Sequence, residues 1–159
     1  MTFCPRLWTL LVCTSLVVPL TTARGAEMAE PAKVTWHTTV ESAWHLTRQQ
    51  GRPLLVFVTR DDCAYCVKMK DRTFSHATVA EAINRGYIPL VLDGGVPTPL
   101  LRELKVSMYP ATFVISPQAV ILARIDGFVP PEALASRLQM ARPGVGVAGV
   151  GPMTSQPAR

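Results

Sequence analysis

The sequence has few histidines and cysteines, the usual ligands of zinc, and no run of basic residues that would attract a nucleic acid. Its 159 residues include only three histidines and four cysteines, and its lysines and arginines are spread out instead of forming a basic stripe. Without such a stripe, a nucleic-acid-binding function is not supported. Charged residues make up 17% and apolar residues 48% of the chain, which excludes a largely disordered protein. No internal repeat is visible, and the length suits a single domain with a real core.

The stretch from Leu7 to Leu20 lacks charge altogether. As a helix, these 14 residues would span roughly 21 Å, which is less than the hydrocarbon core of a bilayer, about 30 Å. The small residues that follow, in TTARGA, suit a cleavage site. We therefore expect residues 1–25 to be a secretory signal peptide and the protein to be exported, either to the periplasm or out of the cell. An uncleaved membrane anchor is the alternative; after cleavage no stable membrane span would remain.

Cleavage near residue 25 would change the chemistry of the chain. It would leave two cysteines, and 14 basic against 11 acidic residues, which is a net charge of +3 instead of +5. Residues 26–32 would form a linker, and the Gly- and Pro-rich residues 142–159 have nothing bulky to bury and are expected to be a disordered tail. The folded domain is expected over residues 33–141. A mature chain of this size has little room for a dimerisation domain, so we expect a monomer.

Helical and strand patterns alternate within that domain. The apolar run in residues 53–59 is typical of a parallel strand buried on both faces. Thr78 and Glu81 predict a capping box at the start of a helix, and Pro131 is expected at the first position of the last helix. The predicted order is helix (38–50), strand (53–59), a cysteine-bearing helix to about Arg72, helix (78–85), strand (87–92), helix (99–106), strands (111–116 and 119–126) and helix (131–140). This order predicts an α/β fold, with a mixed sheet covered by helices on both faces.

Two cysteines are separated by two residues, in Cys63-Ala64-Tyr65-Cys66, directly after the predicted buried strand. Residues three apart on a helix share a face, and a disulfide can persist in an exported protein, so the pair favours redox chemistry. Three alternatives stay open. A structural disulfide would close a very small loop and would stabilise the fold little. A zinc site would need further ligands, for which only His37, His45 and His76 remain, and two inert thiols are the third alternative.

The stretch from about Val34 to Leu138 resembles the thioredoxin superfamily, and in particular its secreted members with a helix before the first central strand. The matching segments are RPLLVFV, CAYCVKMKDRTF, VAEAINRGYIPLVLD, VSMYPATFVIS and RIDGFVPPEAL. A CxxC where a strand meets a helix, with a Tyr-Pro opening a strand 44 residues later, is a specific signal. The resemblance implies a thioredoxin-like fold with an extra N-terminal helix. It also implies a thiol–disulfide oxidoreductase that exchanges disulfides with exported proteins.

The expected roles of the central residues follow from the resemblance and from the helix position. Cys63 is expected to be the attacking thiolate, because free N–H groups at a helix N-terminus stabilise an anion and lower the pKa of a thiol. Cys66 would resolve the mixed disulfide. By resemblance, Pro110 is a cis-proline that faces the two cysteines. No bound cofactor or metal is needed, because the Cys63–Cys66 disulfide is itself the redox centre.

Three further residues are expected at the surface that binds the substrate. Tyr65 lies between the cysteines, and the backbone of Tyr109 would pair with an extended substrate segment. Gly127 is expected to permit close approach of the backbone near the site, and a plain turn after a strand is the alternative. The expected partners are the thiols or disulfides of proteins and peptides, together with an upstream dithiol donor or acceptor.

Two positions depart from the family pattern. Asp62 stands where many relatives have a tryptophan, and Phe57 stands where thioredoxins have a buried acid that helps to deprotonate the resolving thiol. Cys66 would then depend on water or on Lys68 to lose its proton. These departures keep open a second function, a non-catalytic module that binds extended peptides.

The two acids before the first cysteine are expected to tune its chemistry. Asp61 and Asp62 place negative charge beside Cys63, which would destabilise its thiolate and so favour the disulfide. A relatively stable disulfide makes the reduced protein a better electron donor, which biases it toward reductase activity. The alternative is that both side chains point into water and that Asp62 caps the helix.

Overall fold

The computed structural model describes residues 33–142, so the predicted signal peptide, the linker and the tail beyond Arg142 lie outside the described residues. The elements are α1 (Val40–Gln50), β1 (Leu54–Thr59), α2 (Ala64–Lys68), η1 (Met69–Phe74), α3 (Ala77–Gly86), β2 (Ile88–Asp93), α4 (Pro99–Leu104), β3 (Ala111–Ile115), β4 (Ile121–Asp126) and α5 (Pro131–Met140). The predicted order is confirmed, with one refinement. The cysteine-bearing helix has two parts, of which η1 is π-helical.

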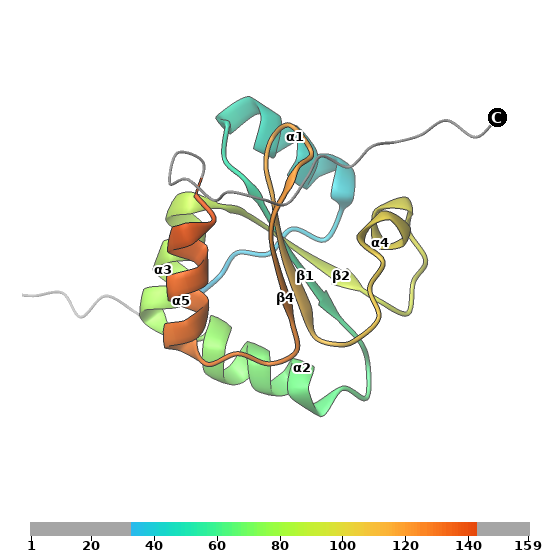
Figure 1. Ribbon diagram of the computed structural model, residues 1–159, viewed down its shortest axis with the longest axis vertical. Helices are drawn as coiled ribbons and strands as arrows, with labels where there is room; N and C mark the ends of the chain where they lie inside the picture. Colours follow the sequence, from blue (N-terminus) through green and yellow to red (C-terminus); the bar gives the residue numbers. More distant parts are fainter. Residues whose placement is uncertain (1–32, 143–159) are drawn as a thin grey trace, which may run out of the picture.

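Four strands within residues 33–142 form one mixed sheet in the order β2-β1-β3-β4. β1 pairs in parallel with β2 and antiparallel with β3, and β3 and β4 form the predicted hairpin. The helices α3 and α5 lie side by side on one face of this sheet, and α1 and α4 cover the other face (Figure 1). The predicted α/β fold, a mixed sheet flanked by helices with an extra N-terminal helix, is confirmed. In the same residues no helix is long and apolar enough to cross a membrane.

The central strand β1 needs cover on both sides because its side chains alternate between the two faces. Leu55 and Phe57 belong to the cluster under α3 and α5. Leu54, Val56 and Val58 belong to the cluster under α1 and α4. All five side chains are at most 1% exposed. The continuous apolar run that predicted this strand is therefore the run that burial on two faces requires.

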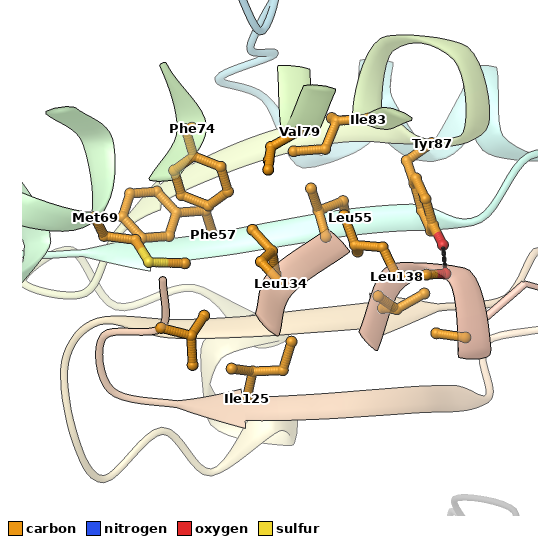
Figure 2. Packing of buried hydrophobic residues seen from close by; sticks show 13 residues of the cluster. Leu55, Phe57, Met69, Phe74, Val79, Ile83, Tyr87, Ile125, Leu134 and Leu138 are labelled. Carbon is orange, nitrogen blue, oxygen red and sulfur yellow. Dashed lines mark hydrogen bonds between the residues drawn. The ribbon is translucent and has the colours of Figure 1, made fainter. Parts of the chain in front are cut away.

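Aromatic rings fill the part of the core nearest to the cysteine-bearing helix. The ring centroid of Phe57 lies 4.8 Å from that of Phe74 and 5.8 Å from that of Trp36. Trp36 and Phe74 meet edge to face at 5.0 Å. Phe57 and Phe74 lie against Met69 of η1, between the sheet and the helices (Figure 2). This aromatic cluster, Trp36, Phe57 and Phe74, supports the helix that carries the cysteines.

A second contact closes the other end of the same core. The hydroxyl of the fully buried Tyr87 donates a hydrogen bond to the carbonyl of Leu138 on α5 (Figure 2). Burial raises the pKa of Tyr87, and the nearby Arg142 partly opposes this shift. The phenol is therefore held in its neutral form, in which it can donate to Leu138.

The predicted capping box at Thr78 and Glu81 is wrong. The helix α3 begins at Ala77, its N-cap is His76, and no side chain caps it. The N–H of His76 donates to the carbonyl of Thr73, so the chain passes from η1 almost directly into α3. Thr78 is then already helical, whereas a capping hydroxyl must belong to the extended residue before the first turn.

Candidate functional site

The pairing of the strands brings the predicted site residues to one end of the sheet, where the strands β1 and β4 finish. The CxxC follows the end of β1, and the last pair between β1 and β3 is Val58 with Ala111. Pro110 therefore lies just beyond that pair, next to the end of β1, from which the chain continues to the CxxC. Gly127 follows β4, and its N–H donates to the carbonyl of Pro110 at 2.7 Å. Residues that are far apart in the sequence thus meet where β1 and β4 end and β3 begins.

The two cysteines form a disulfide at the N-terminus of α2, with their Cα atoms 5.2 Å apart. Cys63 is the N-cap residue, and its Sγ accepts a hydrogen bond from the backbone N–H of Cys66 at 3.1 Å. An N–H directed at a sulfur favours the anionic form of that sulfur once the disulfide opens. Cys66 is 1% exposed, whereas Cys63 is partly exposed. Of the two sulfur atoms, that of Cys63 is therefore the more accessible one and the one that accepts this hydrogen bond.

The cis-proline predicted at position 110 is confirmed, and Gly127 has a backbone conformation that favours glycine. The Tyr109–Pro110 bond is cis. Gly127 has φ 81°, and a Cβ built on it would meet no atom within 4 Å. This positive φ by itself favours glycine, which agrees with the alternative of a plain turn after the strand, and close approach of a substrate backbone at this position stays a prediction. The turn that it makes directs its N–H at Pro110.

The charged residues around the cysteines are exposed. Asp62 has φ 56°, a left-handed conformation that aspartate tolerates, and it precedes the N-cap, so the alternative that it caps the helix is wrong. Asp61 lies beside it in the same turn. The Nζ of Lys68 lies 4.5 Å from the ring centroid of Phe128, within the range of a cation–π contact. Tyr65 is 62% exposed, so its ring is accessible from solvent.

No carboxylate takes the place of Phe57. The buried polar side chains in residues 33–142 are Thr47, Thr73, Thr112 and Ser116, which include no acid. Thr112 stands opposite Phe57 in the strand pairing, and its buried hydroxyl has no hydrogen-bond partner. Nor does this part of the chain gather three or more His, Cys, Asp or Glu residues that could hold a metal ion. A proton acceptor for Cys66 must then come from elsewhere than a buried acid.

Sequence reasoning missed the contacts that hold the ring of Tyr109. Its hydroxyl donates to the carbonyl of Gly94 at 3.2 Å, and the guanidinium of Arg60 lies 5.3 Å from the ring centroid. A Cβ on Gly94 would lie 2.2 Å from Cε1 of this ring, so only glycine fits. Gly94 is itself fixed, because its N–H donates to the carbonyl of Thr59 at 2.7 Å. The Gly-Gly pair after a predicted strand is the signal that could have indicated such a close approach.

We expect Gly94→Ala to displace the Tyr109 ring and to lower the free energy of unfolding by about 1–3 kcal/mol, the usual cost of an extra methyl group in a packed site. Gly95→Ala is the matched control, because its Cβ would meet only the exposed carboxylate of Asp93, at 3.2 Å. Urea unfolding of both oxidised variants measures the difference. If Gly94→Ala lowers the free energy of unfolding no more than Gly95→Ala does, the ring moves aside without additional cost.

The mixed sheet, the CxxC at the start of α2 and the cis-proline directly before β3 define a protein of the thioredoxin superfamily, with a site that supports thiol–disulfide oxidoreductase activity. More particularly, residues 40–142 match the thioredoxin-like domain family. This match covers more than half of the chain, so the chain belongs to that family.

Solved structures with the same fold include the following three proteins. The DsbH oxidoreductase is 20% identical with a TM-score of 0.58, and the match covers 76% of this chain and 94% of that one. A thioredoxin from Thermus thermophilus is 20% identical with a TM-score of 0.62, over 68% of this chain and 86% of that one. The C-terminal domain of DsbD from Neisseria meningitidis, in its oxidised form, is 18% identical with a TM-score of 0.57, over 68% and 100%. No match was found among curated protein sequences. At these identities the likeness shows a shared fold.

Proposed function

We propose that the protein is an exported reductase of protein disulfides. The observation that carries the proposal is the asymmetry of the two cysteines, in which Cys63 is accessible and accepts a hydrogen bond while Cys66 is buried behind it. The charge-free stretch from Leu7 to Leu20 supports export. The likeness to an oxidoreductase, DsbH, supports the class of reaction.

In the proposed reaction, electrons pass from the two cysteines to a client disulfide. The thiolate of Cys63 attacks one client sulfur, which forms a mixed disulfide and releases the other client sulfur as a thiolate. Cys66 then loses its proton and attacks the Sγ of Cys63, which releases the second client thiol and leaves the Cys63–Cys66 disulfide. The client gains the two electrons that the protein loses. An upstream dithiol donor then reduces the protein again.

Reduction of insulin with a dithiol donor tests this function. The wild-type protein is expected to accelerate the reaction, and Cys63→Ser is expected to reduce the rate to the uncatalysed background. Binding of unfolded peptides without any acceleration would instead favour the alternative, a non-catalytic module that binds extended peptides. The direction of electron flow is tested by equilibration with glutathione. For a reductase we expect a potential closer to that of thioredoxin, about −270 mV, than to that of DsbA, about −120 mV.

We expect the paired change Asp61→Asn and Asp62→Asn to move the potential toward oxidising values. Each carboxylate, at roughly 6 Å from the sulfur, would destabilise the Cys63 thiolate by an amount that corresponds to at most about 30 mV. Asparagine accepts the left-handed backbone at position 62, so the turn should persist. The thiolate fraction, followed by its ultraviolet absorbance between pH 4 and 9, is expected to rise at a given pH.

The control for this change is Glu41→Gln, which removes one exposed acid from α1 on a different element. The effect of the paired change is expected to shrink at high salt, because both aspartates are exposed. If the thiolate titration of the paired variant coincides with that of the wild type, the two aspartates do not tune the site.

A further inference from the structure

A pocket of about 330 Å³ opens beside Tyr109, between the loop after β2 and the helix α4. Its lining residues are Gly94, Pro97, Leu101, Arg102, Lys105, Val106 and Tyr109. Tyr109 is the residue before Pro110, so the pocket adjoins the cis-proline segment at the same edge of the sheet as the cysteines. A client segment that reaches Cys63 past Pro110 would therefore run by the mouth of this pocket.

The charge of this pocket is positive. Arg102 and Lys105 line it and are both exposed, and the guanidinium of Arg60 lies over the ring of Tyr109 that forms one wall. None of the lining residues is acidic. The apolar side chains of the lining, Leu101 and Val106, give the pocket a surface on which the methylene groups of a longer side chain can pack.

Neither Arg102 nor Lys105 forms an ion pair with an acid in residues 33–142. The carboxylate of Asp93 accepts a hydrogen bond from the N–H of Gly95 at 2.8 Å. Asp126 pairs with Arg124 at 2.9 Å. Glu103 lines a different pocket, on the side of α4 that faces α1. The other acids at this edge, Asp61 and Asp62, precede the cysteines and would repel a second carboxylate there. Because the exposed cations Arg102 and Lys105 have no ion-pair partner in the described residues, their positive charge is available to a ligand.

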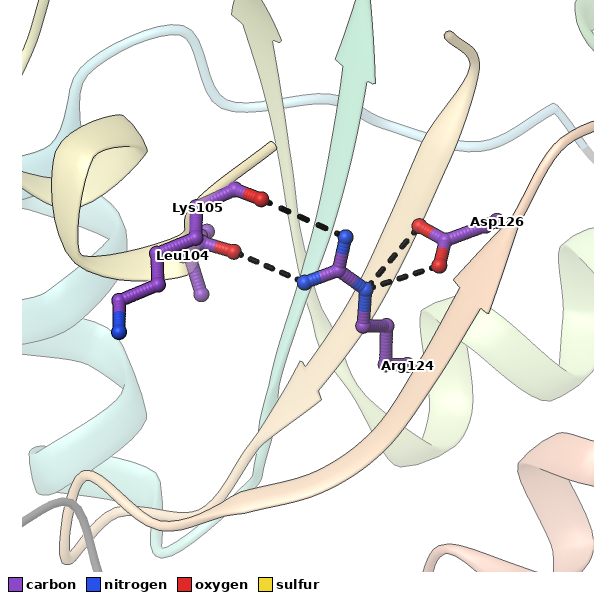
Figure 3. Close-up of polar contacts among 4 residues, drawn as sticks. All are labelled: Leu104, Lys105, Arg124 and Asp126. Carbon is purple, nitrogen blue, oxygen red and sulfur yellow. Dashed lines mark hydrogen bonds and ion pairs between the residues drawn. The ribbon is translucent and has the colours of Figure 1, made fainter. Parts of the chain in front are cut away.

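The walls of the pocket are held in place before any ligand arrives. The ring of Tyr109 is fixed by Gly94 and Arg60, as described above. The other wall is tied to β4 by Arg124, whose guanidinium donates to the carbonyls of Leu104 at 3.1 Å and Lys105 at 3.4 Å while it pairs with Asp126 (Figure 3). A site that is already formed loses little conformational entropy when a ligand binds.

We propose that this pocket is a subsite that selects clients with an acidic side chain close to the reacting cysteine. The inference rests on the proposed function and names the substrate class of the same site. The guanidinium of Arg102 can bind a carboxylate through two parallel hydrogen bonds, and the ammonium of Lys105 adds a second positive charge. The negative charges of Asp61 and Asp62 before Cys63 and the positive charges of the pocket beside Tyr109 would together set the direction in which a client segment lies across the site.

Synthetic peptides with one cysteine, activated as the 2-thiopyridyl disulfide, provide the test. The thiolate of Cys63 attacks the peptide sulfur and releases pyridine-2-thione, whose absorbance reports the rate; Cys66 then releases the peptide thiol and closes the Cys63–Cys66 disulfide. Two peptides carry a pair of glutamates either before or after the cysteine, and their partners carry glutamines. At one of the two positions, we expect the glutamate peptide to react about fivefold faster than its glutamine partner at low salt. This difference in rate should fade at high salt.

The paired change Arg102→Gln and Lys105→Asn should abolish that advantage. Asparagine suits position 105, where φ is 47°. The matched control removes two exposed cations from the opposite face of the sheet, with Arg85→Gln on α3 and Arg137→Gln on α5, and should keep the advantage.

Three results would overturn the proposal, and the third is distinguishable from the first two. Equal rates for the glutamate and glutamine peptides, or an advantage that survives in the Arg102 and Lys105 variant, would exclude the subsite alone. Reaction with the neutral reagent 2,2′-dithiodipyridine separates this outcome from a failure of the proposed function. If the reduced protein reacts with that reagent no faster than a free thiol does, both the oxidoreductase function and the subsite are excluded.

Discussion

Cys66→Ser is expected to convert the protein into a trap for its clients. Cys63 remains accessible and can still attack a client disulfide, but the mixed disulfide is no longer attacked by a second thiol. Turnover of insulin should fall to about the uncatalysed background, while covalent complexes accumulate. The expected asymmetry follows from burial, because Cys66 is 1% exposed and its sulfur is bonded to that of Cys63 in the oxidised protein. Non-reducing gels and intact mass spectrometry measure the complexes.

The control is Cys63→Ser, which should lose turnover without forming complexes. In that variant the remaining thiol of Cys66 is buried, so neither client nor alkylating reagent should reach it in the folded protein. If instead Cys63→Ser collects clients and Cys66→Ser does not, the roles of the two cysteines are reversed.

The second large effect is expected in stability, from the residue that replaces the buried acid of thioredoxins. Phe57→Ala should lower the free energy of unfolding by roughly 3–5 kcal/mol, the range for removing a buried phenylalanine side chain. Phe57 is 1% exposed and its ring contacts those of Trp36 and Phe74, so its loss removes two aromatic contacts and leaves a cavity beneath the cysteine-bearing helix. Urea unfolding of the oxidised protein measures the change.

Tyr65→Ala provides the comparison, because it removes a ring of similar size that is 62% exposed. Its effect on the free energy of unfolding should stay within about 0.5 kcal/mol. A loss below about 1 kcal/mol in Phe57→Ala would contradict the cavity argument, since it would mean that the neighbouring rings close over the space.

The elements that the sequence predicts well are those whose signals are local. The apolar run of β1 requires burial on both faces wherever the strand lies, so it predicts a central strand before any partner is known. The fixed φ of Pro131 suits the start of α5 for the same local reason. The CxxC and the cis-proline are recognised because the resemblance to a family supplies their distant pairing, which spacing alone does not.

Local signals fail where the neighbouring element changes the backbone. The capping box at Thr78 has the right residue types, but η1 leads so closely into α3 that the helix begins earlier, at Ala77. The α2 helix is capped by Cys63 and not by Asp62, because the turn after β1 places Asp62 in a left-handed conformation. Both differences depend on how the preceding element ends, which residue type does not report.

By itself, therefore, the sequence determines the order of the elements, the buried strand and the pair of cysteines, because each is encoded in residues that are close together in the chain. The tertiary structure alone decides which cysteine is accessible, why Gly94 cannot carry a side chain, and that Arg124 ties α4 to β4. These features join residues from separate elements. Their positions depend on strand pairing and side-chain packing across the whole domain, and no local pattern carries that information.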